Sequence, residues 1–298
     1  MRTPFLSILL AVSVVPGCGG GGDALNPAAF LGPVKRVQVG PVNYGYYRFG
    51  SGPPLVLIGG LGSTTSSWTL PLLHRLSRRH ELIVFDNRGI GFSTDADRAP
   101  LTIQSMASST VGLLDALALE RPDVLGWSMG GKIALTLAAL HGDKVGKVVA
   151  VSADAGSTNT VPPSQEVLDL LMDPDATPDQ ILELFFPEDE QAAAARYAVV
   201  YAAMPRDDPQ QEALPRQAEA IARFVAAQEV WDRLPEVSNP VLLIAGAEDV
   251  VTPAENSERV AERLPNAELV TVPDAGHAVL FQEEDALVPL IESFLGGG

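Results

Sequence analysis

The segment Gly126-Trp-Ser-Met-Gly130 follows a short apolar run at residues 122–125 and precedes a helix-like run at residues 131–141. A serine between glycines at such a junction predicts a very sharp strand-to-helix turn that projects the Ser128 hydroxyl above a sheet. The glycines permit close backbone approach, and the helix N-terminus directs its N–H dipoles toward a developing anion. We therefore predict that Ser128 is a nucleophile.

A serine hydroxyl needs a positioned base to take its proton, and chain order selects His277 from the four histidines. His277 ends the loop at residues 273–277, after the last strand-like run, and it alone lies late enough for the order serine, acid, histidine that this turn implies. The other three histidines lie in or beside earlier predicted elements: His74, His80 and His141. His277 is the predicted base.

The acid that orients the imidazole is expected at the end of another strand. Asp249 follows the strand-like residues 241–245, which places its carboxylate at the same sheet edge as the serine. Asp154, after an earlier strand-like run, and Glu248, one residue away, remain alternatives. A turn or helix-cap role fits all three, and we favour Asp249 as the acid.

Two backbone N–H groups are needed to stabilise an oxyanion. Met129, directly after the nucleophile, is expected to supply one, and Leu61 in the glycine-rich loop at residues 59–62 the other. Glycine lets that loop bend toward a substrate, although a plain strand-to-helix turn is the alternative. We expect three residues near the nucleophile to line the substrate pocket: Gly60, Trp68 and Trp127. Trp127 fits core packing equally well.

The chain has 298 residues, and 46% of them are hydrophobic, enough for a large globular core. Thirty-seven Asp and Glu against twenty Lys and Arg give a net charge of −17. A surface that negative repels phosphate backbones, so nucleic-acid binding is excluded as a main function. One cysteine and four histidines allow no internal disulfide and favour no metal site. We expect neither a metal nor an organic cofactor.

Strand-like and helix-like segments alternate along most of the chain. Apolar runs suited to buried strands lie at residues 55–58, 82–85, 122–125, 145–151, 241–245 and 268–272. Helix-like patterns lie at residues 70–79, 103–119, 131–141, 255–264 and 285–295. This alternation predicts an α/β fold with a mostly parallel sheet, of the eight-stranded type, and helices on both faces. Residues 155–234 contain no strand-like run and predict a helical cap, which leaves a core of residues 37–154 and 235–298.

The N-terminus predicts export. Residues 1–17 resemble a secretory signal, because Arg2 precedes an apolar run over residues 5–15 that is too short for a permanent membrane helix. Cys18 follows a small residue, as in the lipobox of bacterial lipoproteins, and we expect its lipidation, with residues 18–36 as a flexible tether. The protein is then a membrane-anchored lipoprotein of the cell envelope; a cleaved, secreted or periplasmic form is the alternative.

Several of these segments together resemble the α/β-hydrolase superfamily, in the branch of small esterases, lactonases, C–C hydrolases and cofactor-free perhydrolases. The matching segments are Gly59-Gly-Leu61, residues 86–93 (Asp-Asn-Arg-Gly-Ile-Gly-Phe-Ser), residues 126–130, Gly246-Ala-Glu-Asp249 and Gly276-His277. They span nearly all of residues 37–295 outside the cap. The resemblance implies a catalytic triad with an oxyanion pair: Ser128, Asp249 and His277, with Leu61 and Met129.

One difference from most of that superfamily matters, and the residue at position 128 narrows the choice of branch within it. Most relatives carry His-Gly where this chain has Gly59-Gly60, so the hydrogen bond that anchors this loop must come from elsewhere. A serine instead of an aspartate at position 128 disfavours the dehalogenases and epoxide hydrolases, whose ester intermediate requires a carboxylate. Asp86 and Arg88 are expected to be structural.

These features predict a serine hydrolase that cleaves a small carboxylic ester or lactone through an acyl-enzyme on Ser128. One alternative uses the same three residues for acyl transfer, perhydrolysis or C–C bond hydrolysis. Another, from a different class, is a ligand-binding or sensory protein on the same fold.

Overall fold

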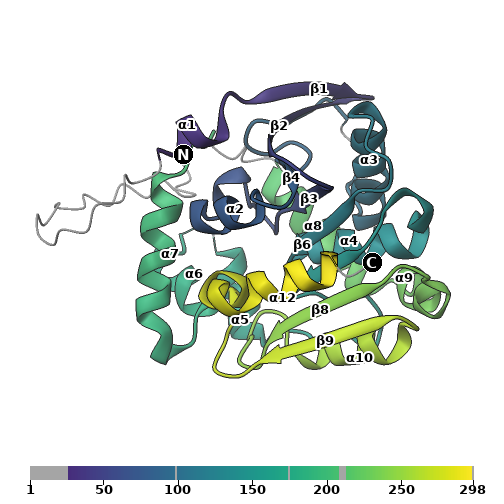
Figure 1. The fold of residues 1–298 in the computed structure, drawn as a ribbon. Coiled ribbons are helices and arrows are strands. Elements are labelled where there is room, and N and C mark those ends of the chain that lie inside the picture. Colours follow the sequence, from purple (N-terminus) through teal and green to yellow (C-terminus); the bar gives the residue numbers. More distant parts are fainter. Residues whose placement is uncertain (1–25, 98, 174, 208–212, 297–298) are drawn as a thin grey trace, which may run out of the picture.

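The computed structural model describes residues 26–97, 99–173, 175–207 and 213–296 (Figure 1). Over these residues the strands are β1 (Lys35–Val39), β2 (Val42–Gly50), β3 (Pro54–Ile58), β4 (Glu81–Phe85), β5 (Thr94–Asp95), β6 (Asp123–Trp127), β7 (Val148–Val151), β8 (Val241–Gly246) and β9 (Ala267–Val272). The helices are α1 (Pro27–Leu31), α2 (Leu70–Leu76), α3 (Ile103–Ala116), α4 (Met129–Leu140), α5 (Gln165–Met172), α6 (Pro178–Phe185), α7 (Gln191–Ala203), α8 (Ala213–Val225), α9 (Glu229–Arg233), α10 (Glu255–Arg263), α11 (Val279–Gln282) and α12 (Glu284–Gly296).

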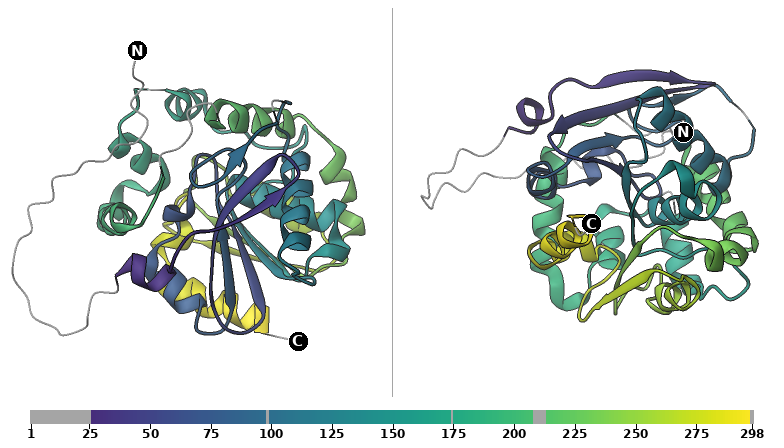
Figure 2. Two further views of the ribbon diagram at one scale, coloured as in Figure 1. Left: turned by 90° about the horizontal axis from the view of Figure 1, so that it is seen from above. Right: turned by 45° about the vertical axis from the view of Figure 1, so that its right-hand side comes forward.

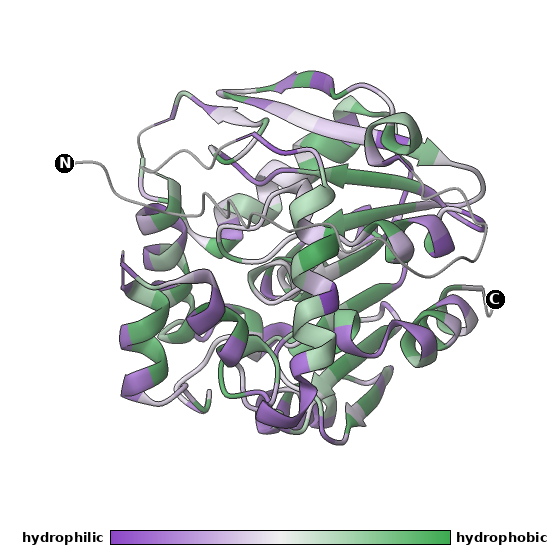
Figure 3. Ribbon diagram, turned by 90° about the vertical axis from the view of Figure 1, so that its left-hand side faces the viewer, coloured by the Kyte–Doolittle hydropathy of each residue, from purple (hydrophilic) through white to green (hydrophobic). Residues whose placement is uncertain are grey.

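All nine strands join one sheet in the order β1-β2-β4-β3-β6-β7-β8-β9, with β5 paired to β2. The six strands from β4 to β9 in that order run parallel, as the apolar runs predict. These strands are strongly hydrophobic, whereas most helices carry both hydrophobic and hydrophilic residues (Figure 3). The predicted mostly parallel α/β sheet is confirmed. It has one strand more than expected, because the two-residue strand β5 bridges to β2.

Parallel pairing brings the carboxyl ends of the central strands to one edge. Ile58 at the end of β3 pairs with Phe85 of β4 on one side and with Gly126 of β6 on the other. The loops that follow these strands therefore meet at the same edge, and in open α/β sheets ligands bind at this edge. The residues predicted to act in catalysis all follow the ends of such strands.

Helices cover both faces of the sheet (Figure 1). Helices α3, α4 and α10 pack on one face, and Ile133 and Val260 belong to the buried cluster there. Helices α2, α11 and α12 pack on the other face, with Leu73 and Ile291 among the buried residues. Helix α4 is enclosed along almost its whole length, since it runs directly behind β6 and β7.

The segment between β7 and β8 contains helices α5 to α9 and, among its described residues, no strand. Helices α5 to α8 group along one side of the sheet (Figure 2). Helix α9 falls inside the predicted cap of residues 155–234 and packs against α4, and Val230 and Leu234 lie in the core cluster. We use the name cap for helices α5 to α8.

The C-terminal part of the predicted tether of residues 18–36 contains helix α1. Asn26 caps helix α1 with its side-chain oxygen, Leu31 is buried against the core, and β1 begins at Lys35. The hairpin of β1 and β2 lies outside the predicted strands. The predicted signal of residues 1–17 and Cys18 lie outside the described residues.

Asp86, at the end of β4, ties two loops of the sheet edge together. Its carboxylate accepts hydrogen bonds from the Thr65 N–H, after β3, and from the Phe92 N–H at 2.6 Å. The residue is completely buried, and burial raises the pKa of Asp86 to about 7 despite these two donors. Asp86 is structural, as the sequence suggests.

The raised pKa of Asp86 predicts how its contribution to stability changes with pH. An unfolded aspartate titrates near pH 3.8, so between pH 4 and 7 the folded protein holds a proton that the unfolded chain has lost. The contribution of Asp86 to stability is therefore fully present below pH 4, falls as the pH rises from 4, and is lost once the pH has risen through 7. We expect Asp86→Asn to cost more unfolding free energy at pH 5 than at pH 8, by on the order of 2 kcal/mol. Urea denaturation at both pH values measures this; an equal cost would contradict the assignment.

Candidate active site

Ser128 occupies a strained turn between β6 and α4. Its backbone has φ +57° and ψ −120°, a conformation that costs a serine on the order of 1–3 kcal/mol. The turn closes only because neighbouring positions lack side chains: a Cβ at Gly130 would lie 1.8 Å from the Ile58 carbonyl oxygen, and one at Gly126 would lie 2.1 Å from the Gly130 carbonyl oxygen. The predicted sharp strand-to-helix turn is present.

Three of the predicted site residues form one chain of hydrogen bonds. Ser128 Oγ lies 2.9 Å from His277 Nε2, and His277 Nδ1 lies 2.9 Å from Asp249 Oδ2. Asp249 Oδ1 also accepts hydrogen bonds from two backbone N–H groups of its own loop, those of Val251 and Thr252. His277 and Asp249 are buried and Ser128 is half-buried, so only the serine end of this chain is open to a substrate.

The backbone of His277 is held by a side chain at the end of β6 and by one just after β7. Its carbonyl oxygen accepts hydrogen bonds from Trp127 Nε1 at 2.9 Å and from Ser152 Oγ at 3.0 Å. Gln282 bonds both the Gly276 N–H and the Asp274 carbonyl, which closes the loop around the histidine. Ser152 and Gln282 could not be predicted from the sequence, because their partners are backbone atoms brought close only by the fold.

The alternative acids are engaged elsewhere or exposed. Asp154 forms a buried ion pair with Lys132 of helix α4. Glu248 is exposed on the loop after β8. The other histidines lie apart from Ser128: His74 neighbours Phe30, His141 lies beside Ser108, and His80 is buried just before β4.

The glycine loop after β3 lies against Ser128. A Cβ at Gly60 would stand 3.2 Å from Ser128 Cβ, so the absence of a side chain keeps the space above the serine open. Asn87 Nδ2 donates a 3.0 Å hydrogen bond to the Gly59 carbonyl oxygen, which supplies the loop anchor that the sequence left unassigned. No described residue accepts a hydrogen bond from the Leu61 or Met129 N–H, so both donors are free for a ligand oxygen.

Trp68 and Trp127, predicted to line the pocket, lie in the packed core. They are 1% and 3% exposed. Both indole rings meet Phe281 edge-on, and Trp127 also packs against Phe185 of the cap. Trp127 contacts the site directly, through its hydrogen bond to the His277 backbone and through its ring contact with the imidazole.

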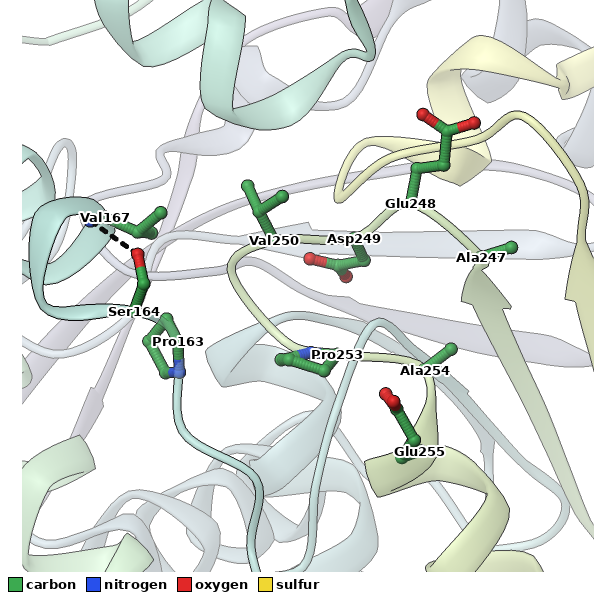
Figure 4. Close-up of a pocket in the computed structure, with 10 residues that line it drawn as sticks. All are labelled: Pro163, Ser164, Val167, Ala247, Glu248, Asp249, Val250, Pro253, Ala254 and Glu255. Atoms are coloured by element: carbon green, nitrogen blue, oxygen red, sulfur yellow. Dashed lines mark hydrogen bonds between the residues drawn. The ribbon is translucent and has the colours of Figure 1, made fainter.

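A surface hollow of about 460 Å³ lies between the loop after β8 and the beginning of α5. Its lining includes Asp249 and Ser164 but neither Ser128 nor His277 (Figure 4). It lies at the acid end of the hydrogen-bonded chain, away from the open hydroxyl. Within the described residues, no group of three or more His, Cys, Asp or Glu side chains is placed to hold a metal ion. No helix among them has the length and apolar composition to cross a bilayer.

Comparison with known proteins agrees with this geometry. The family model described as alpha/beta hydrolase fold matches residues 53–284. A protein named putative carbamate hydrolase RutD, from Caulobacter sp. (strain K31), is 30% identical over 88% of this chain and 99% of its own. An enol-lactonase structure from Burkholderia xenovorans LB400 superposes with a TM-score of 0.74 at 25% identity, over 88% of this chain and 100% of its own. An alpha/beta hydrolase fold protein from Chitinophaga pinensis gives a TM-score of 0.78 at 24% identity, over 89% and 98%. The chain belongs to the α/β-hydrolase family.

Proposed function

We propose that this α/β-hydrolase is a serine hydrolase that cleaves a small carboxylic ester or lactone through an acyl-enzyme on Ser128. The observation that carries the proposal is the continuous hydrogen-bonded chain from the half-buried Ser128 hydroxyl through His277 to Asp249. A hydroxyl bonded to an imidazole that is itself oriented by a carboxylate is the arrangement that activates a serine for acyl transfer.

Each group has a step in this mechanism. His277 Nε2 takes the Ser128 proton as the oxygen attacks the substrate carbonyl, and the Leu61 and Met129 N–H groups stabilise the resulting oxyanion. His277 then gives the proton to the leaving oxygen. In the second half, His277 removes a proton from water, which attacks the acyl-enzyme and regenerates Ser128. Asp249 keeps Nδ1 protonated throughout, so that Nε2 faces the serine.

The relatives support an acyl substrate and add a second candidate. The enol-lactonase structure, at 25% identity, favours a lactone or ester. The relatives named putative carbamate hydrolase favour a carbamate, whose carbonyl meets the same nucleophile but carries a nitrogen leaving group. Hydrolysis of either class of substrate would use the same residues of this chain. A panel of esters, lactones and carbamates ranked by kcat/KM separates the two candidate functions.

Replacing the nucleophile tests the mechanism. We expect Ser128→Ala to lower kcat for short p-nitrophenyl esters by about 10³–10⁶-fold, because the remaining donors and the binding site alone give little acceleration. Intact-mass spectrometry of enzyme quenched during turnover should show one acyl group on the wild type and none on the variant. Ser152→Ala is the matched control, because Ser152 is a serine at the same sheet edge whose side chain only donates to the His277 carbonyl oxygen. The kcat of this variant should fall by no more than about tenfold. Equal activity of Ser128→Ala and wild type would contradict the proposal.

The two buried aspartates are distinguished by activity and stability. Asp249→Asn should lower kcat by about 10³–10⁴-fold, because an amide no longer fixes the histidine tautomer. Asp154→Asn should lower stability by about 3–5 kcal/mol, because it leaves the Lys132 ammonium buried without its partner. Its kcat per folded molecule should stay within about tenfold of the wild type. Kinetics combined with urea denaturation check both variants, and the reverse pattern would make Asp154 the acid.

We further propose that residues 1–17 direct export and that Cys18 becomes the lipidated mature N-terminus, so that the enzyme is anchored at the bacterial cell envelope. The support is the sequence pattern, a short apolar run followed by a small residue and cysteine. Several acyl chains on one cysteine suffice for stable anchoring.

Mass spectrometry of protein purified from bacterial membranes tests the N-terminus. We expect a mature chain that begins at Cys18 and carries lipid, and a Cys18→Ser variant that is released from the membrane fraction. An unmodified Cys18 in the membrane-purified protein would end the lipoprotein proposal and leave the hydrolase proposal untouched.

A further inference from the structure

Gln217, on cap helix α8, bonds directly to the glycine loop beside the nucleophile. Its carboxamide Oε1 accepts a 3.0 Å hydrogen bond from the Gly62 N–H. The residue is 0% exposed, although glutamine is rarely enclosed completely. Gly62 directly follows Leu61, whose N–H is the proposed oxyanion donor. One hydrogen bond therefore links the cap to the loop that must hold the oxyanion.

The glycine loop is a tight turn in which the Gly62 N–H has no hydrogen-bond partner within the turn. The Ser63 N–H donates to the Gly60 carbonyl oxygen at 3.2 Å, and Gly62, in the third position, has φ +66°. A turn with these features is of type II, and its central peptide, which carries the Gly62 N–H, faces out of the turn. The Gly60 carbonyl belongs to the preceding peptide and points toward the Ser63 N–H. Because the N–H and C=O of a trans peptide point in opposite directions, the Leu61 N–H of that same peptide points away from Ser63.

Helix α8 packs against this turn at a second point. A Cβ at Gly62 would lie 2.5 Å from Leu214 Cδ2, so the cap side chain occupies the space beside the glycine. The cap also contacts the histidine loop, where the Ala278 N–H donates to the Phe185 carbonyl oxygen at 3.0 Å. The cap thus contacts the loops on both sides of Ser128.

Only one end of the Gln217 amide has a hydrogen-bond partner among the described residues. Gln217 Nε2 is buried and has no hydrogen-bond partner among the described residues. An unpaired buried donor costs about as much free energy as one hydrogen bond returns. An apolar side chain of the same volume would avoid that cost but would leave the Gly62 N–H without this acceptor. The oxygen bonded to Gly62 is the feature that an apolar residue would lack.

We propose that Gln217 is a positioning residue: by accepting the Gly62 N–H it holds the central peptide of the turn, and thereby keeps the Leu61 N–H directed at the oxyanion on the substrate bound to Ser128. The inference rests on the proposed function. With this role for Gln217, the oxyanion site is complete only when the cap packs against the glycine loop, because one of the contacts that shape the site comes from the cap.

Gln217→Met tests this role, since methionine keeps the volume and removes the oxygen acceptor. We expect kcat for a short p-nitrophenyl ester to fall by about 10- to 100-fold, less than the loss of an entire donor, with KM changed less than about threefold. The inhibition constant of a trifluoromethyl ketone, which forms an oxyanion on the serine, should rise by the same factor as kcat/KM falls. Neither this constant nor KM depends on the fraction of enzyme that is folded.

Arg216→Met is the matched control on the same helix. Arg216 bonds the carbonyl oxygens of Asp97 and Ala99, so this variant weakens the attachment of α8 without touching the glycine turn. We expect its ketone inhibition constant and its kcat to stay within about threefold of the wild type. Wild-type kinetics in Gln217→Met, or an equal rise of the ketone constant in both variants, would overturn the inference. If Ser128→Ala keeps full activity, the proposed function fails instead.

Discussion

The backbone of Ser128 is held in a conformation that serine avoids, and the rest of the site is arranged around it. The turn places the hydroxyl at the sheet edge and starts helix α4 one residue later, which leaves the Met129 N–H free. It is possible only because Gly126 and Gly130 bring β6, α4 and β3 closer than any side chain would allow. The strain is offset by the packing of α4, whose residues are nearly all buried behind the sheet.

The other loops of the site are tied to this turn by specific hydrogen bonds. Asn87 anchors the glycine loop from the end of β4, Trp127 and Ser152 hold the His277 carbonyl from the ends of β6 and β7, and the cap contacts both loops. Every such bond joins segments far apart in the sequence. The geometry of the reacting groups therefore depends on the packed sheet edge as a whole, and a displaced cap alters the oxyanion side of the site.

Local patterns predicted much of this architecture. The six parallel strands are short apolar runs because both their faces are buried, and the spacing of glycines around Ser128 identifies the turn. Chain order led to His277 and Asp249, which the structure places in hydrogen-bond contact with each other. The hairpin of β1 and β2 was not predicted, since its strands mix exposed and buried residues. Asn87, Ser152 and Gln217 were not predicted either, because each acts on a distant backbone atom. Trp127 was left undecided between pocket and core because sequence does not show which partner its indole N–H reaches.

The most direct test of this account is a crystal structure of the protein after reaction with a phosphonate ester that mimics the tetrahedral intermediate. We expect phosphorus bonded to Ser128 Oγ, with its oxygen within about 2.7–3.1 Å of both the Leu61 and Met129 nitrogens. An adduct on another residue, or a phosphonyl oxygen directed to solvent away from these two groups, would contradict it.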